Sequence, residues 1–192
     1  MANYLARCAS PRVPDYAIIK AVVPTGQTLN AGDIVALTAL DTTFITANNY
    51  QVFSATQPAT ANLGNMMAIV VNDGFETLAD GRRPDGNPDY TTYTYGAGEV
   101  VTCVLLVPGL VFEISMDCVT NGTSAVAGDI IEPVNASYAP SRIAAATGQT
   151  AGTMSGLKVL TTKYFRMGGQ FGGNFIQTIV AMAIPPKASA GA

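Results

Sequence analysis

The stretch "VPTGQTLNAGDIVAL" (residues 23–37) returns in similar form as "VTNGTSAVAGDIIEP" (residues 119–133). The two blocks align without gaps, and their second glycines, Gly32 and Gly128, lie 96 positions apart, half the length of the 192-residue chain. Three explanations fit this similarity: the same turn chemistry used twice, a duplication of two related subdomains, or chance.

Each block has the chemistry of a tight turn that leads into a strand. The first glycine permits a positive φ, and the second glycine, followed by aspartate, forms the entry into the strand. The aspartate side chain can accept hydrogen bonds from backbone amides and fix the turn. Neither block has the GK[ST] ending of a phosphate-binding loop. The predicted structural turn residues are Gly26, Gly32, Asp33, Gly122, Gly128 and Asp129.

Similarity outside these blocks is weak. The segments "GNMMAIVV" (64–71) and "SGLKVLTT" (155–162) are candidates for a second correspondence, but with a different spacing.

The pattern along the rest of the chain predicts an all-β protein. Short apolar or β-branched runs alternate with turn signals every 8–12 residues, which is typical of a barrel or a sandwich. We therefore expect an all-β barrel or β-tulip-like sandwich with long loops and little helix, although 142–147 and 176–184 could also be helical. The predicted strands are 16–23, 34–40, 44–46, 50–55, 66–71, 90–95, 99–107, 110–114, 130–134, 141–146, 157–165 and 174–184.

Domain boundaries follow from proline and from polar segments. Residues 1–15, interrupted by Pro11 and Pro14, are either disordered or an extended arm that reaches a neighbouring subunit, and we favour the arm. Residues 16–186 form the β domain, with lobes at 16–114 and 115–186 if the repeat is real. Residues 187–192 are a flexible tail.

A long polar segment, residues 72–96, interrupts the first half of the chain. Its acidic residues raise the alternative of a calcium site, but the order of an EF-hand is absent and the pair Arg82-Arg83 opposes a cation. We expect a solvated loop. The tyrosines that follow are either cross-strand packing residues, which we prefer, or an exposed patch that binds sugar or protein: Tyr90, Tyr93 and Tyr95.

Composition narrows the functional classes. Hydrophobic residues make up 48% of the chain, enough for a core, but charged residues make up only 12%, about half the usual share of roughly 25%. Either the surface is Thr-rich, as in β-rich secreted or viral proteins, or much of it is covered in an assembly. The net charge of −3 argues against nucleic-acid binding.

Catalytic and metal chemistry have few candidate residues. The chain has no histidine, which excludes Ser-His-Asp, Cys-His and HExxH sites within it. The cysteines Cys8, Cys103 and Cys118 are widely spaced and form neither a zinc motif nor a disulfide framework. A glycosidase that uses carboxylates alone remains the enzymatic alternative. We predict that the protein is not an enzyme and uses no cofactor or metal.

Targeting signals are also lacking in the sequence. No apolar run reaches the roughly 18 residues of a spanning helix, and the first residues have no apolar signal-peptide core. We expect no membrane partner and synthesis in a cytoplasm.

Several features together resemble the decoration, or cement, proteins that bind the outside of tailed-bacteriophage capsids. These features are the low charge, the "AGDIV" turn after "GQTL", the "GLVFEI" strand, the second "AGDII" turn and the closing "IVAMAIP" strand. The resemblance covers residues 16–185 in style, without a diagnostic motif. It implies a β-rich, often trimeric protein whose N-terminal arm latches onto neighbouring subunits.

The functional expectation follows from this resemblance. The protein would be a late structural protein of the virion, made in the bacterial host cytoplasm, that binds the major capsid protein and other copies of itself and stabilises the head. The alternative is a carbohydrate- or receptor-binding β module on the virion surface. The expected contact residues are Tyr4, Leu5, Arg7, Val13, Arg82, Arg83, Tyr90, Tyr93 and Tyr95.

Overall fold

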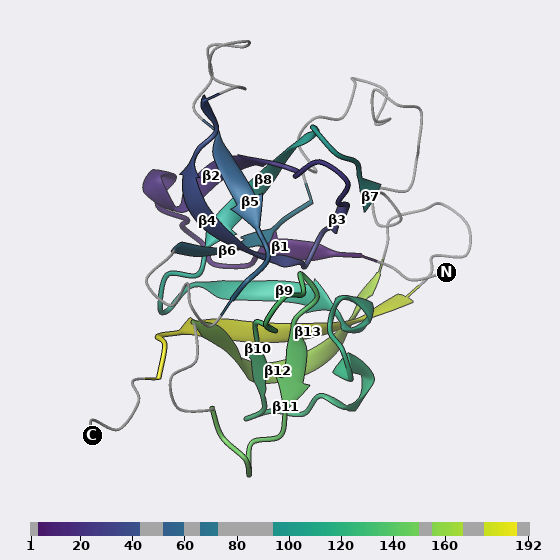
Figure 1. The fold of residues 1–192 in the computed structure, drawn as a ribbon. Coiled ribbons are helices and arrows are strands. Elements are labelled where there is room, and N and C mark those ends of the chain that lie inside the picture. The colour runs from purple at the N-terminus through teal and green to yellow at the C-terminus, as the bar shows by residue number, and fades with distance from the viewer. Residues whose placement is uncertain are drawn as a thin grey trace.

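A computed structural model describes residues 4–42, 52–59, 66–72, 94–149, 155–166 and 175–187. The named elements within these ranges are β-strands and three short 3-10 helices, which confirms the all-β prediction (Figure 1). The segments 142–147 and 176–184, for which helix was an alternative, contain strands β11 (Ser141–Ile143) and β13 (Phe175–Ile184).

The first lobe is a closed five-stranded barrel with the neighbour order β2-β5-β4-β6-β8. All neighbours are antiparallel except β2 and β5, whose parallel pairing closes the ring. A two-stranded sheet of β3 (Leu29–Asn30) and β7 (Thr94–Tyr95) is separate from the barrel. The barrel strands are β2 (Ile18–Val22), β4 (Ile34–Leu40), β5 (Phe53–Thr56), β6 (Met66–Val70) and β8 (Val100–Leu105).

The second lobe is a six-stranded sheet with the order β1-β9-β13-β12-β10-β11. An isolated parallel bridge between Thr120 and Ser141 links the segment after β9 to β11. This bridge resembles the parallel β2–β5 closure of the first lobe. The other strands of this sheet are β1 (Ala6–Cys8), β9 (Val111–Ser115), β10 (Ile130–Glu132) and β12 (Gly156–Arg166).

The two lobes repeat one arrangement of five strands. In chain order, β2, β4, β5, β6 and β8 correspond to β9, β10, β11, β12 and β13. The neighbour order β2-β8-β6-β4-β5 matches β9-β13-β12-β10-β11, except that β9 also pairs with β1 and does not form a ladder with β11. The registers agree as well. Ile34 pairs with Ile69 as Ile130 pairs with Lys158.

The registers of the neighbouring strands, β8 and β2 in the first lobe and β13 and β9 in the second, agree as well. Ile69 in turn pairs with Val104, as Lys158 pairs with Met182. Val104 pairs with Ile18 as Met182 pairs with Val111, so the repeated registers extend across both sheets. Of the three explanations for the repeated sequence block, this agreement supports duplication.

The spacing between equivalent positions changes along the chain, which hides the repeat in the sequence. It is 93 for β2 and β9, 96 for β4 and β10, 89 for β6 and β12, and 78 for β8 and β13. The step from 93 to 96 matches the three-residue helix η3 (Met116–Cys118). Residues 66–70 correspond to 155–159, which corrects the sequence alignment of 64–71 with 155–162 by two positions.

The repeated turn has the same hydrogen bonds in both lobes. Gly32 N–H donates to the Val70 carbonyl at 2.8 Å, as Gly128 N–H donates to that of Val159 at 2.9 Å. Gly32 and Gly128 also share a φ of +95°. The second glycine therefore has the same backbone geometry and the same hydrogen bond at the entry to the strand in both blocks. At the first glycine the blocks differ, because Gly26 has a φ of +75° whereas the positive φ of the second block falls on Asn121, before Gly122.

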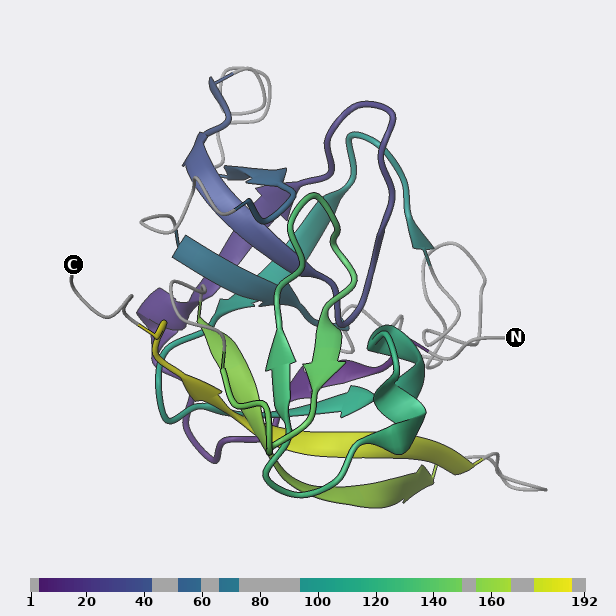
Figure 2. The ribbon, with the colours of Figure 1, turned by 60° about the horizontal axis from the view of Figure 1, so that its bottom comes forward.

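The hydrophobic core has two parts, and alternation along β4 separates them. Val35 and Leu37 point into the first barrel, while Ile34 and Ala36 join a second cluster that fills the second lobe and the space between the lobes. Strand β4 is thus buried on both faces over these four residues. The loop between β10 and β11 also reaches the barrel (Figure 2), where Ile34 N–H donates to the Tyr138 carbonyl at 2.9 Å.

The boundary between the lobes lies before β9. The sequence placed it after residue 114, but Val111–Ser115 pairs with β1 and β13 of the second sheet. The change of lobe therefore occurs between Leu105 and Val111, where Pro108-Gly109 turns the chain.

Candidate interaction surfaces

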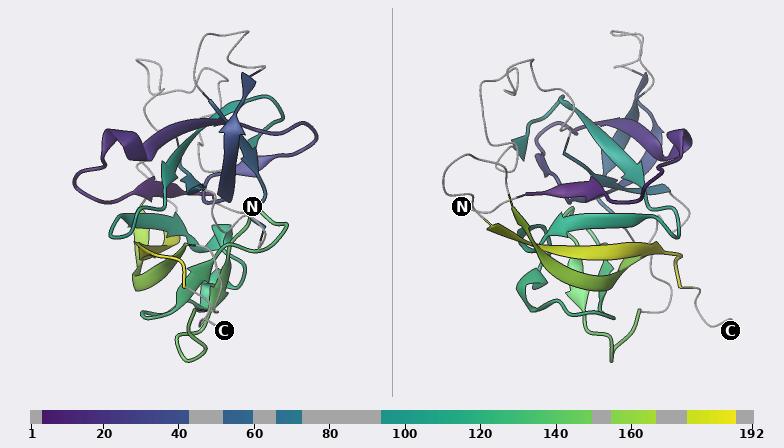
Figure 3. Two further views of the ribbon diagram at one scale, coloured as in Figure 1. Left: turned by 60° about the vertical axis from the view of Figure 1, so that its left-hand side comes forward. Right: turned by 180° about the vertical axis from the view of Figure 1, so that it is seen from behind.

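The described part of the N-terminal segment, residues 4–15, belongs to the folded body, which corrects the expected separate arm. Strand β1 pairs antiparallel with β9 and lies between the barrel and the rest of the second sheet (Figure 3). Leu5 is buried, and Val13 packs against the central core. The Tyr4 carbonyl accepts a hydrogen bond from the Asn72 side-chain amide at 3.1 Å. The buried Leu5 side chain is therefore used within the chain and is not available to a neighbouring subunit.

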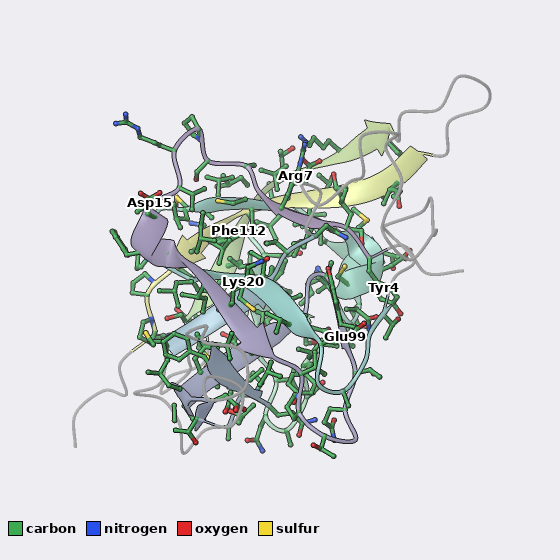
Figure 4. All side chains as sticks on the ribbon, turned by 90° about the horizontal axis from the view of Figure 1, so that it is seen from above. Tyr4, Arg7, Asp15, Lys20, Glu99 and Phe112 are labelled. Carbon is green, nitrogen blue, oxygen red and sulfur yellow. The ribbon has the colours of Figure 1, made fainter. Side chains whose placement is uncertain are left out.

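A buried carboxylate lies on β9 of the second sheet, between β1 and β13. Glu113 on β9 is fully buried, yet its carboxylate lies 2.6 Å from the Arg7 guanidinium and 3.1 Å from the Lys163 amino group. Thr178 donates to it from β13 at 2.9 Å. The four residues lie on β1, β9, β13 and β12, so the cluster ties four neighbouring strands together. Figure 4 shows Arg7 on the N-terminal strand, near Phe112 of β9.

The charge balance explains why Glu113 is tolerated inside the protein. Burial by itself raises the pKa of this carboxyl group, but the hydrogen bonds from Arg7, Thr178 and Lys163 outweigh burial and hold the pKa below its ordinary value of 4.5. Arg7 and Lys163 remain 49% and 46% exposed. The arrangement is that of a structural ion cluster.

Replacing Arg7 with methionine should lower the free energy of unfolding by about 1 kcal/mol at pH 7, because the buried carboxylate loses one of two cations that water partly screens. Since the pKa of Glu113 is lowered in the fold, its stabilising contribution is present above pH 4.5 and is lost as the pH falls. Urea unfolding of both proteins at pH 7 and pH 3 measures this. An equal difference at both pH values would contradict the assignment.

The two repeated aspartates have different surroundings. Asp129 forms an ion pair with Arg142 at 2.6 Å and accepts from Val126 N–H and Ala145 N–H. Burial raises the pKa of Asp129, but Arg142 and the two backbone donors lower it more strongly, to below its ordinary value. Asp129 is therefore ionised, and its carboxylate holds the second turn in place.

Asp33, its counterpart in the first lobe, lacks such a cation among the described residues. Its carboxylate accepts a hydrogen bond from Asn30 N–H at 2.7 Å, and Gln57 occupies the position equivalent to Arg142. Burial raises the pKa of Asp33 to about 6, although the Asn30 bond opposes this. Nearby Cys118 also has a raised pKa, about 12, mainly through burial, so its thiol is not a reactive thiolate.

The described ranges contain no candidate metal centre. No group of three or more acidic or cysteine side chains that could hold a metal ion occurs there. No helix in that part of the chain is long and apolar enough to cross a membrane. The three cysteines form no disulfide bonds, and Cys103 and Cys118 are buried.

One end of the first barrel exposes large apolar side chains. Strands β2 and β6 begin at this end and β4 finishes there, because β2 and β6 are both antiparallel to β8 and β4 is antiparallel to β6. We call this surface the barrel-end patch. Its members are the exposed residues Tyr16, Ile18, Leu40 and Met66.

A second exposed apolar feature is the hairpin of β12 and β13. Beyond residue 160 these strands pair with each other, past the point where β10 leaves β12, and the hairpin extends from the second lobe (Figure 3). A bulge separates Val159 from Thr161 in the ladder. Leu160 is 42% exposed and Tyr164 is 67% exposed.

Of the other predicted contact residues, the structure describes Tyr95. Tyr95 is buried, pairs with Leu29 and belongs to the core of the barrel, so it cannot be part of an exposed aromatic patch. Arg82, Arg83, Tyr90 and Tyr93 lie outside the described residues, as does most of the loop 72–96.

The Glu113 ion cluster and the barrel-end patch had only weak signals in the sequence. In "GLVFEI", the alternation of residue types predicted a strand but not that its glutamate would be buried against cations from β1 and β12. The barrel-end patch depends on the directions in which three strands run through the barrel, which no local pattern indicates. No protein-family model, curated protein or solved structure matches this chain.

Proposed function

We propose that the protein is a structural component of a tailed-phage virion that binds the outer surface of the major capsid lattice and stabilises the head. The observation that carries the proposal is the barrel-end patch of Tyr16, Ile18, Leu40 and Met66. The four side chains lie where β2 and β6 begin and β4 ends, and large apolar side chains that are exposed on one end of a domain are typical of a protein-binding site. Further copies of the chain and the major capsid protein are the proposed partners.

Two other observations support this proposal. The buried carboxylates Asp33, Glu113 and Asp129 are used in turns and in an ion cluster, which suits a scaffold better than an acid–base site. The low charge of the chain also suits a surface that is covered over much of its area in an assembly, because charged residues are depleted at the centres of interfaces. The capsid as partner rests on the resemblance in the sequence.

The barrel-end patch can be tested by binding to capsids. Expanded, emptied heads produced from the genome that encodes this chain are mixed with the purified protein and sedimented. We expect Ile18→Lys to weaken binding at least about tenfold, since a buried charge without a partner costs more than about 1.4 kcal/mol. The matched control is Val126→Lys, an exposed apolar residue on the second lobe.

The outcomes separate the alternatives. If the unchanged protein does not sediment with the heads, or if that genome encodes no capsid lattice, the proposed function is wrong. If it binds and both variants bind equally well, the barrel-end patch is not the contact. Tyr95 is buried in the core and cannot contribute to the carbohydrate-binding alternative. A glycan array would test whether the chain binds sugars through its other predicted tyrosines, Tyr90 and Tyr93.

A further inference from the structure

The hairpin of β12 and β13 leaves one strand edge open. Strand β10 pairs with β12 at Leu157 and Lys158, and the turn at Gly128 and Asp129 bonds to Val159. From Thr161 to Arg166, strand β12 pairs with β13 alone among the described residues. A two-stranded ribbon is at best marginally stable in water, so an open edge of this length favours the addition of another strand.

The repeat shows how the first lobe covers the same edge. Val71 corresponds to Thr161, and Asn72 to Thr162, because their partners on β8 and β13 hold equivalent positions. Asn72 N–H donates to the Ala6 carbonyl at 2.9 Å, and Ala6 N–H donates to the Asn72 side-chain oxygen. An extended segment, the start of the chain, thus covers the edge in the first lobe. The second lobe has no such segment in the described part of the chain.

Along this open edge of β12, the backbone groups of alternate residues point away from β13. The Lys163 carbonyl faces β13, because it accepts a hydrogen bond from the Thr178 hydroxyl at 3.4 Å. Backbone groups of successive residues in a strand point to opposite sides. The N–H and C=O groups of Thr162 and Tyr164 therefore face away from β13, as those of Asn72 face Ala6.

We propose that this edge pairs with the same edge of a second copy of the chain, so that one sheet continues antiparallel across a two-fold axis. In such a pair, residues whose backbone groups point away from β13 must lie opposite each other. Near the middle of the open edge this leaves two registers, one with the two-fold axis at Lys163 and one with the axis at Tyr164. A register centred on Lys163 places two ammonium groups opposite each other and is disfavoured. A register centred on Tyr164 separates the lysines and places two exposed tyrosines opposite each other, and it is the one we infer.

This interface is independent of the barrel-end patch and of the proposed capsid binding. Capsid binding could fail while the chain still pairs with itself, and the reverse holds as well. The side chain of Tyr164 accepts a hydrogen bond from Gln177 at 2.9 Å within its own hairpin, which positions it on the face of the ribbon.

Cysteine cross-linking tests the register directly. In the inferred pairing the Cα atoms of the two Tyr164 residues lie about 5.5 Å apart, within the range of a disulfide. We expect Tyr164→Cys, in a Cys8→Ala background, to form disulfide-linked dimers under mild oxidation. Thr162→Cys is the matched control, because its two copies would lie about 13 Å apart along the strand, and it should cross-link at least about tenfold more slowly.

Sedimentation of the unchanged chain completes the test. We expect a dimer at about 100 µM, where contacts of micromolar affinity are populated, and a monomer for Tyr164→Lys, which sets like charges on the axis. A chain that stays monomeric would overturn the proposal. So would equal cross-linking of the two cysteine variants, or a dimer that Tyr164→Lys leaves intact.

Discussion

Replacing Gly32 with alanine is expected to lower the free energy of unfolding by about 3–5 kcal/mol, a large share of the roughly 5–15 kcal/mol that a domain has. Gly32 has a φ of +95°, which a side chain disfavours. A Cβ atom there would also lie 2.5 Å from the Cβ of Cys118, on the helix η3 that is inserted in the second lobe. Backbone strain and a clash between the lobes therefore add, and thermal or urea unfolding measures the sum.

The repeat supplies the control for this prediction. Gly128 has the same φ of +95° and the equivalent hydrogen bond, but among the described residues a Cβ atom there would meet only Ala145, at an ordinary 3.5 Å. Gly128→Ala should therefore cost only the strain of the backbone, about 1–2 kcal/mol. If the two variants are destabilised equally, the lobes do not pack at Gly32 as described.

Neutralising the two repeated aspartates should change stability in opposite directions at pH 7.5. Asp33→Asn is expected to raise the free energy of unfolding by roughly 2–3 kcal/mol, because a buried carboxylate whose pKa is raised from 3.8 to about 6 opposes folding when it is ionised. Asp129→Asn should lower it by about 2 kcal/mol, because the ion pair between the buried Asp129 and the partly exposed Arg142 is lost.

The dependence on pH separates these effects from general damage. Because the folded pKa of Asp33 is raised, its contribution is fully favourable below pH 3.8 and is lost as the pH rises to about 6. The gain from Asp33→Asn should therefore vanish at low pH. The pKa of Asp129 is lowered, so the cost of Asp129→Asn should shrink as the pH falls below 3.8. Urea titrations from pH 3.5 to 7.5 test both, and effects of the same sign would contradict the assignments.

The sequence predicted the strands well because each one is a local signal. The run "IVALTAL" was predicted as a strand over 34–40, the bounds that β4 has. β-branched and apolar residues between glycine-rich turns determine such elements with little help from the rest of the fold.

The extent of the repeat was not predictable in this way. Loops of different length and the three-residue helix η3 change the spacing between equivalent strands from 78 to 96 positions. The side chains of equivalent strands also differ, as with Lys20 and Glu113, which hold the same register position. Only the turn, where glycine and aspartate have backbone roles, kept a visible sequence signature.

The place of the N-terminal segment shows the other limit of sequence reasoning. Prolines and weak periodicity suggested an arm, and the segment is indeed extended, but its partner is β9 of its own chain more than 100 positions away. A pattern of residue types gives the conformation of such a segment and not the strand with which it pairs. The same reason kept the Glu113 ion cluster out of the predicted site.

An electron cryo-microscopy map of mature heads from the encoding genome would test the proposed function most directly. We predict density for this chain on the outside of the capsid lattice, with Tyr16, Ile18, Leu40 and Met66 buried against the major capsid protein. Heads that lack the chain, or that carry it with this barrel end facing solvent, would contradict the account.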